Sequence, residues 1–355
     1  MEYLIGSEKE FLEFVKNINS DDKIAILTHT DLDGFASGIF LEEILAKYKL
    51  KPELVEFLQY QFGICEKTIP KLKESKISKI FVLDMCLESA DEKGFEKLRE
   101  EFEVFLIDHH PTTNELKNTK NILKTKTLDC SALAIYEMGV KNKLIDEKKL
   151  KWLINATIIS EYGFKDDKNL KFLQNSDEKI TIENAFESPL AEFSKIIGGA
   201  LIYFNSKKMP LVEIYNLIKK KDLDSLKKFD EEVKTEIEKH LKEFEKNSEF
   251  YPEKNLHIYY FNSKFSITST LSTIISSKDF KGVFIFMKDS ESELGKIKIS
   301  ARCQSNRVDM NFLMRKSVEG LENSVAGGHV PAAGATIMKK DLEKFKQNIF
   351  HFLKP

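Results

Sequence analysis

Three short apolar segments in the first third of the chain each lead directly into acidic residues. They cover residues 24–28, 80–83 and 104–107, and they precede His29-Thr30-Asp31-Leu32-Asp33-Gly34, Asp84 and Asp108-His109-His110, respectively. In an open parallel sheet, ligands bind at the carboxyl ends of the strands where the strand order changes direction, so these acids can meet. Carboxylates and imidazoles together, with one carboxylate as a bridge, are the donors that two divalent ions require. We therefore expect a two-metal phosphoesterase centre.

The length and composition predict a folded protein of two or three domains. The chain has 355 residues, of which 42% are hydrophobic, and this suffices to bury a large core. It has no run of about 18 apolar residues and no charged leader before an apolar stretch, so we expect a cytoplasmic protein with no membrane contact. Its four cysteines lack Cys-x-x-Cys spacing, which predicts reduced thiols rather than a zinc ribbon or a disulfide framework.

The charge pattern suggests one candidate site for binding phosphate. The formal net charge of -2 excludes binding of nucleic acid through a strongly basic surface alone. Only four of the 55 basic residues are arginines, and three of these four fall within residues 302–315. An arginine binds phosphate through two parallel N–H groups, so this cluster is a candidate phosphate-binding surface. Chance placement in a lysine-rich chain is an equal alternative for each arginine.

Residues 1–175 have the pattern of a doubly wound α/β domain. Short β-rich runs alternate with amphipathic stretches, as in a parallel sheet covered on both faces. A helix is predicted over residues 35–46, directly after the first acidic motif. Because a helix N-terminus favours anions, a substrate phosphate near Gly34 and Ser37 is expected. Asp33 alone is also explained as the cap of that helix.

Residues 176–255 are predicted to be a helical connector. An apolar stripe recurs every three or four residues on a helix otherwise rich in Lys and Glu. Packing against a core is the favoured use of this stripe, and partner binding is the alternative. His240 lies among charged residues, so we expect it to be solvated. The stripe consists of Leu226, Phe229, Val233, Ile237, Leu241 and Phe244.

Residues 256–355 are predicted to be a smaller α/β domain. Strands are expected over residues 256–261, 283–286 and 296–300, with an amphipathic stretch over residues 266–277. The segment 327–334, Gly-Gly-His-Val-Pro-Ala-Ala-Gly, allows a ligand to approach the backbone closely. Its exposed amides can bind a phosphate, although a glycine-rich loop alone is a weak signal.

The acidic motifs have a common chemistry. His29, Asp31 and Asp33 occupy alternate positions, and on an extended backbone alternate side chains share one face. With Asp84, Asp108 and the two histidines that follow, they can hold two ions and activate a water for in-line attack on phosphorus. Each motif alone has a structural explanation, because Asp is a common turn former and a His pair can pack in a core. Their coincidence favours the metal centre.

These motifs, in this order, resemble the DHH phosphoesterase superfamily with its DHH-associated substrate domain. The resemblance rests on His-Thr-Asp-Leu-Asp-Gly-x-x-Ser, the isolated Asp84 at the end of a strand, Asp-His-His, and the C-terminal Gly-Gly-His-x-x-Ala-Ala-Gly. A histidine two positions before the first Asp is similar to the archaeal RecJ-like exonucleases in particular. The resemblance covers both ends of the chain and leaves the helical middle unmatched.

The resemblance implies a ligand set for two divalent ions, usually Mn²⁺, with Mg²⁺ or Co²⁺ as alternatives. One ion would be held by His29, Asp31 and Asp84, and the other by Asp33, the bridging Asp84 and His109. The family has a fourth Asp on the second ion. Here the best match is Glu161, whose longer side chain alters the position of the oxygen; Asp166 and Asp167 are the competing candidates.

The resemblance also implies catalytic and substrate-binding residues. Asp108 would orient its neighbours, as metal-binding imidazoles require, and His110 would face the scissile phosphate, with Asp84 as the third catalytic residue. In the associated domain the substrate clamp would be made by Arg302, Gly327, Gly328 and His329, with Ser300, Asn306 and Arg307 as weaker candidates.

The function expected from this resemblance is a Mn²⁺-dependent exonuclease that releases mononucleotides from single-stranded DNA or RNA, in replication, repair or RNA processing. One alternative is a phosphodiesterase of short oligonucleotides or cyclic dinucleotides. An alternative of another class is a catalytically weak scaffold of a replicative or repair helicase complex, which Glu161 and the charged helical segment motivate. The complete set of converging acids and imidazoles argues against the scaffold.

Overall fold

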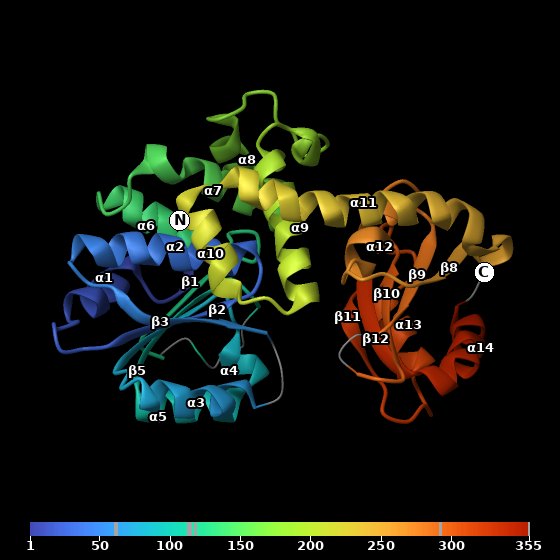
Figure 1. Ribbon diagram of the computed structural model, residues 1–355, viewed down its shortest axis with the longest axis horizontal. Coiled ribbons are helices and arrows are strands. Elements are labelled where there is room, and N and C mark those ends of the chain that lie inside the picture. Colours follow the sequence, from blue (N-terminus) through green and yellow to red (C-terminus); the bar gives the residue numbers. More distant parts are fainter. Residues whose placement is uncertain (60–62, 112–115, 117–118, 291–292, 354–355) are drawn as a thin grey trace. The chain divides into compact units, whose positions relative to one another are not determined.

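The computed structural model describes residues 1–59, 63–111, 116, 119–290 and 293–353 (Figure 1). The chain divides into two compact units. The first consists of Met1–Phe204 and Met209–Asp230, and the second of Asn205–Lys208 and Glu231–Pro355. Residues 176–230 thus pack mainly with the first unit and residues 231–255 with the second. The predicted division into a catalytic domain, a connector and a substrate-binding domain stays a prediction.

The first unit is built on a six-stranded sheet in the order β1-β6-β5-β4-β2-β3. Five strands are parallel, and β1 runs antiparallel to β6. The strands are β1 (Tyr3–Ile5), β2 (Ile24–His29), β3 (Pro52–Leu58), β4 (Lys79–Leu83), β5 (Glu103–Asp108) and β6 (Ile122–Thr125). The three strands predicted before the acidic motifs are confirmed as β2, β4 and β5.

The strand order changes direction between β2 and β4. From β2 the chain first adds β3 on one side, then returns to place β4, β5 and β6 on the other side. A crevice at the carboxyl ends of the strands is expected at such a switch point. The segment after His29 and the residue Asp84 both lie there, because each directly follows one of these two strands.

Helices cover both faces of this sheet, which confirms the doubly wound α/β class. Figure 1 shows α3 and α5 on one face, with α1, α2 and α6 on the other. Alternate strand residues point to opposite cores, so Phe81 and Leu83 join one apolar cluster while Ile80 and Val82 join the other. The helices of this unit are α1 (Glu8–Lys16), α2 (Leu32–Lys47), α3 (Ile64–Glu74), α4 (Leu87–Ala90), α5 (Glu92–Glu101), α6 (Ser131–Lys141), α7 (Glu147–Ser160), α8 (Asp167–Gln174), α9 (Ala191–Lys207) and α10 (Leu211–Lys220).

The second unit has its own six-stranded sheet, in the order β11-β12-β10-β9-β8-β7. Only β8 and β9 are parallel among the paired strands described. The predicted strands and helix of this region are confirmed. The elements are β7 (Glu249–Tyr251), β8 (Leu256–Phe261), α12 (Thr268–Ser276), β9 (Val283–Asp289), β10 (Lys296–Arg302), α13 (Met310–Ser317), β11 (Val325–His329), β12 (Ala332–Met338) and α14 (Leu342–Phe352).

The long helix α11 (Leu223–Asn247) carries the predicted apolar stripe. Leu226 and Val233 are fully buried, and Phe244 stacks on Phe286 at 5.5 Å between ring centroids. The prediction that His240 is solvated was wrong. His240 is 2% exposed, because it follows Val233 by two helical turns and therefore lies on the same apolar face. Two acids of the same helix, Glu236 and Glu243, contact its ring nitrogens at 3.3 and 3.0 Å.

Two expectations from composition were tested by the structure. Cys65, Cys86, Cys130 and Cys303 are all free thiols, and three of the four are buried. Among the described residues, no helix has both the length and the apolar character needed to cross a bilayer.

Candidate metal centre

The first acidic motif forms the junction between β2 and α2. His29 is the last residue of β2, and Asp31 caps α2 by accepting a hydrogen bond from the Gly34 N–H at 3.0 Å. The helix therefore begins three residues earlier than predicted, and the predicted cap, Asp33, lies in its first turn. Gly34 is required for this tight junction, since a Cβ there would lie 2.4 Å from the carbonyl oxygen of His29.

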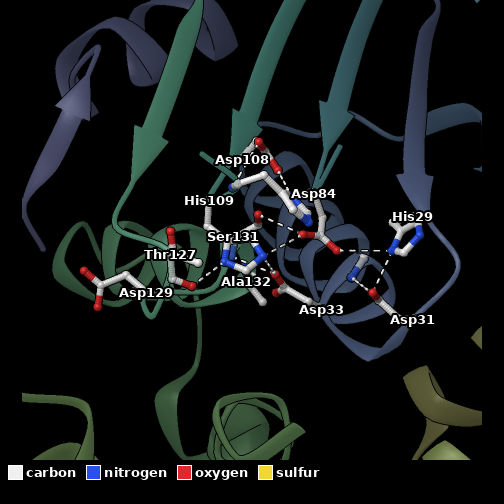
Figure 2. Close-up of polar contacts among 12 residues, drawn as sticks. His29, Asp31, Asp33, Asp84, Asp108, His109, Thr127, Asp129, Ser131 and Ala132 are labelled. Atoms are coloured by element: carbon white, nitrogen blue, oxygen red, sulfur yellow. Dashed lines mark hydrogen bonds and ion pairs between the residues drawn. The ribbon is translucent and has the colours of Figure 1, made fainter. Parts of the chain in front are cut away.

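Asp84 lies between two imidazoles (Figure 2). Its Oδ2 is 3.8 Å from Nδ1 of His29, and its Oδ1 is 3.4 Å from Nε2 of His109. The His29 nitrogen also contacts Asp31 at 2.6 Å. Asp84 has a φ of 59°, a left-handed backbone conformation that is uncommon outside glycine and that often occurs at functional sites.

His109 is oriented by the main chain. Its Nδ1 lies 2.7 Å from the carbonyl oxygen of Thr127, so this nitrogen carries the proton and donates. The other nitrogen, Nε2, is then left with a free lone pair that faces Asp84 and, at 3.7 Å, Oδ2 of Asp33. A backbone acceptor that fixes the tautomer in this way is typical of metal-binding histidines.

Asp33 is held by the N-terminus of α6. Its two carboxylate oxygens accept hydrogen bonds from the backbone N–H groups of Ser131 and Ala132, both at 2.8 Å. The Ser131 hydroxyl also contacts Asp84 Oδ1 at 3.3 Å. Sequence reasoning missed this element. A helix start at Ser131, directly after Asp129 and Cys130, was the available signal.

The donors fit a pair of divalent ions. Two groups of three residues have donor atoms within 4.8 Å of one another: His29 with Asp31 and Asp84, and Asp84 with His109 and His110. Asp84 is common to both, as a bridging carboxylate must be. Its Oδ2 is buried and has no hydrogen-bond donor among the described residues, which leaves it available to a cation. Asp33 is adjacent to the second group rather than within it.

The electrostatics of the cluster also favour a cation. Burial, followed by the charges of Asp33 and Asp31, raises the pKa of Asp84 well above its usual value. Burial likewise raises the pKa of Asp33, although the charge of His109 opposes it. Burial opposes ionisation of Asp31 too, but the hydrogen bond and charge of His29 lower its pKa to about 2. Several carboxylates in one place therefore repel one another unless a positive charge enters.

Glu161 shares the field of this cluster. It caps the C-terminus of α7, and burial together with the charges of Asp31 and Asp33 raises its pKa well above the ordinary value. Its competitor Asp166 is engaged elsewhere, since its carboxylate accepts the N–H groups at the start of α8. Asp167 is exposed in the first turn of that helix. The role of Glu161 as a metal ligand stays a prediction.

Asp108 and His110 form a second polar group beside the centre. Oδ1 of Asp108 contacts Nδ1 of His110 at 2.7 Å, and the other carboxylate oxygen contacts Nζ of Lys124 at 2.5 Å. Burial opposes ionisation of Asp108, but these two partners lower its pKa to about 2. Burial opposes protonation of His110, and Asp108 outweighs it and raises the pKa of His110.

The second unit contains a cavity of about 410 Å³ that is lined by its sheet and by the start of α12. It includes four of the predicted residues, Ser300, Arg302, Gly327 and Gly328. Arg302 donates from Nη2 to the Ser269 hydroxyl at 2.9 Å. Six other polar lining residues were missed by sequence reasoning: Ser266, Thr268, Ser269, Lys288, Asp289 and Lys298. In β10 (Lys-Ile-Lys-Ile-Ser-Ala-Arg) polar and apolar residues alternate, and this period of two was the signal for a polar face.

Four other predicted residues lie outside both the candidate metal centre and the cavity of the second unit. His329 is exposed at the end of β11 and does not line the cavity. Asn306 is exposed in a turn, and the guanidinium of Arg307 donates to the carbonyl oxygens of Lys281 and Lys254, both at 2.7 Å. Ser37 is fully buried within α2, and its position does not support direct contact with a phosphate.

A doubly wound α/β fold with a centre of acids and imidazoles is typical of the phosphoesterase class. The chain belongs to the DHH family: residues 23–159 match the DHH family N-terminal domain, and residues 254–354 match the DHHA1 domain. The superfamily resemblance noted from the motifs is thereby confirmed. Members of this superfamily are generally hydrolases of phosphate esters.

Solved structures share the fold at low sequence identity. Mn²⁺-bound RecJ from Thermus thermophilus covers 98% of this chain with a TM-score of 0.66 and 14% identity. The match covers 54% of that RecJ, so this chain spans about half of its length. The DHH domain of a member of the s1p family of ribosomal proteins has a TM-score of 0.71 and 16% identity, covering 100% of this chain and 94% of its own.

A third neighbour is CDC45 from Entamoeba histolytica, with a TM-score of 0.62 and 12% identity over 97% of this chain and 98% of that protein. These likenesses establish the fold alone. No curated protein matches the sequence.

Proposed function

We propose that this chain is a metal-dependent exonuclease that releases mononucleotides from single-stranded DNA or RNA. The observation that carries the proposal is the position of Asp84, whose two oxygens face one imidazole each and which belongs to both potential metal groups. Structures of RecJ with the same fold contain Mn²⁺ or Mg²⁺, and one is described as an exonuclease. Mn²⁺ is therefore the favoured ion, with Mg²⁺ and Co²⁺ as alternatives.

In this proposal each residue of the centre has a distinct task. His29, Asp31 and Asp84 hold one ion, and Asp33, Asp84 and His109 hold the other, with Glu161 as an additional ligand. When bound, the ions supply a nucleophilic water at neutral pH and neutralise charge on the phosphoryl group. The N-terminus of α6 fixes Asp33 in position. His110 faces the scissile phosphate and donates a hydrogen bond to it, while Asp108 holds its ring.

In this proposal the second unit binds the single-stranded nucleic acid. Arg302 and Lys298 bring positive charge to the cavity, and the glycines at 327 and 328 leave space for a phosphate or a sugar to reach the backbone. A single strand is bound in general by basic grooves that follow its phosphates. We assign the cavity to backbone phosphates of the substrate.

A scaffold function is the second candidate, because CDC45 aligns with this chain over nearly the full length of both proteins. In that case the chain would be a catalytically weak partner of a replicative or repair helicase complex. The converging donor atoms argue for the enzyme, since a scaffold has no need of a buried carboxylate oxygen, Oδ2 of Asp84, that lacks a hydrogen-bond donor among the described residues.

The test is cleavage of single strands of DNA and of RNA, labelled separately at each end, in Mn²⁺, beside the Asp84→Ala variant and a dinucleotide. Stepwise release of mononucleotides from long strands, lost in the variant, supports the exonuclease and defines polarity and sugar preference. Cleavage of the dinucleotide alone would assign the chain to the short-oligonucleotide phosphodiesterases. No cleavage of any substrate despite tight Mn²⁺ binding would favour the scaffold in replication or repair.

A further inference from the structure

Lys124 is a fully buried cation within a strand whose other residues are apolar or small. It lies in β6, whose residues are all buried, and its side chain is 0% exposed. A buried ammonium is costly unless all of its donors are engaged. The groups around its ammonium therefore indicate the role of this lysine. The acidic motifs alone did not predict that role.

The ammonium of Lys124 lies close to three oxygen atoms. Oδ2 of Asp108 and Oε1 of Glu88 each lie at 2.5 Å, and the backbone carbonyl oxygen of His110 lies at 3.4 Å. Glu88, on the short helix α4, has a side chain that is only 2% exposed. Two buried carboxylates and the main chain of His110 therefore surround the ammonium.

Asp108 connects Lys124 to His110. Oδ1 of Asp108 contacts the ring Nδ1 of His110 at 2.7 Å, and Oδ2 accepts the backbone N–H of His110 at 3.2 Å. The registry of the sheet places the parts together, because Asp108 on β5 pairs directly with Lys124 on β6. His110 is thus held at its ring, its amide and its carbonyl by two side chains that are themselves fully buried.

We propose that Lys124 is a positioning residue for the reaction, which holds the imidazole of His110 toward the scissile phosphate through Asp108 and through the His110 carbonyl. The inference rests on the proposed function, in which His110 contacts the phosphate. Glu88 forms a buried ion pair with Lys124 and balances its charge. Preorganised contacts of this kind matter for catalysis because a small displacement of a catalytic group costs much of its effect.

A single replacement of Lys124 would leave two buried carboxylates without a counter-ion and could prevent folding. The test variant therefore combines Lys124→Met with Glu88→Gln, which removes one charge of each sign. Its matched control makes the same exchange at an exposed ion pair, Lys71→Met with Glu56→Gln. Thermal unfolding and Mn²⁺ titration confirm that each variant is folded and loaded.

The kinetic test is a cycle with His110→Ala, measured on labelled single-stranded DNA. We expect the buried double replacement to lower kcat about 10- to 100-fold with KM and Mn²⁺ affinity little changed, as for losses of residues that orient catalytic groups. In the His110→Ala background, the same replacement should have no further effect. An equal loss of kcat in both backgrounds would mean a general structural role and would overturn the proposal.

A second readout does not depend on activity. In the Mg²⁺-loaded protein with ¹⁵N-labelled histidine, the hydrogen-bonded Nδ1–H of His110 is assigned as the resonance that His110→Ala removes. We expect the buried double replacement to shift or broaden it and the control pair to leave it unchanged. If the buried double replacement leaves the resonance unaltered, the positioning role is refuted. If the replacement alters the resonance but the wild-type protein cleaves no substrate, only the exonuclease proposal is refuted.

Discussion

Asp33 accepts a hydrogen bond from the backbone N–H of Ser131 at 2.8 Å, although the two residues are 98 positions apart in the chain. The contact joins the first acidic motif to the positive end of the α6 dipole, where a carboxylate is favoured. The same carboxylate accepts the N–H of Ala132. The metal centre is therefore partly preformed by the protein, before any ion binds.

Asp33→Asn is expected to loosen the first turn of α6. The amide can accept from only one of the two N–H groups and directs its own donor at the other. Loss of a charge-assisted hydrogen bond should speed exchange of the Ser131 and Ala132 amides about tenfold or more. Hydrogen exchange by NMR on the metal-free protein measures this, with Asp21→Asn as an exposed control. Unchanged protection at both amides would contradict the anchoring role.

Asp84→Asn should stabilise the metal-free protein while it removes metal binding. Because burial and nearby acids raise the pKa of Asp84 above its unfolded value, its stabilising contribution is present below about pH 4 and is lost as pH rises through the folded pKa. At neutral pH the Asp84 carboxyl group thus costs stability, because the folded protein disfavours its ionised form. We expect the variant to gain on the order of 1 kcal/mol in urea unfolding with EDTA.

The same experiment with metal should reverse the order of the two proteins. Mn²⁺ at 100 times its dissociation constant should add about 2.7 kcal/mol to the unfolding free energy of the wild type and nothing to Asp84→Asn. Thermal unfolding with Mn²⁺ and then with excess EDTA checks reversibility. Equal stabilisation of both proteins by Mn²⁺ would place the ion elsewhere.

The three strands before the acidic motifs and the doubly wound α/β class could be predicted because buried apolar runs and the acids after them are local signals. Asp31 and Asp33 were correctly expected near His29, but for the wrong reason. The argument assumed extended backbone, whereas α2 begins at Leu32, so Asp33 reaches the centre from a helical turn. The sequence pattern did not show this because the Gly34 junction, which permits the early helix start, depends on contact with the His29 carbonyl.

Contacts distant in the chain were beyond sequence reasoning. No local pattern tells that the amide of Ser131 will meet Asp33, or that Lys124 will pair with Asp108 across two strands. His240 was misassigned because sequence neighbours were weighed rather than helical neighbours. The period of the α11 stripe places position 240 on the apolar face, where Tyr259 and Phe261 pack against its ring.

Glu161→Gln tests the departure from the family's fourth Asp. If Glu161 is a ligand of one ion, the neutral side chain should weaken Mn²⁺ binding about 10-fold or more, as changes at metal sites commonly do. Asp167→Asn, an exposed acid on the following helix, is the matched control. Calorimetric titration of both variants resolves the two sites. Affinities equal to the control would remove Glu161 from the ligand set and leave the second ion with Asp33, Asp84 and His109.

His257 should make the second unit less stable in mild acid. Its ring is stacked on Phe250 and Phe284 at 4.3 and 5.0 Å between centroids, and its buried Nδ1 has no hydrogen-bond partner among the described residues. Burial lowers the pKa of His257, against a small opposing effect of Asp279. The unfolded chain then binds the proton more readily, so stability is complete above about pH 6.5 and is lost as pH falls through the folded pKa.

His257→Phe removes this titration and keeps an aromatic ring in the stack. The free energy of unfolding in urea should fall less between pH 7.5 and pH 5.5 in this variant than in the wild type, when both are metal-free. His351→Phe, at an exposed histidine of α14, should retain the wild-type dependence. A wild-type slope in His257→Phe would show that protonation of the ring is tolerated in the stack, and the acid sensitivity would then belong to other groups.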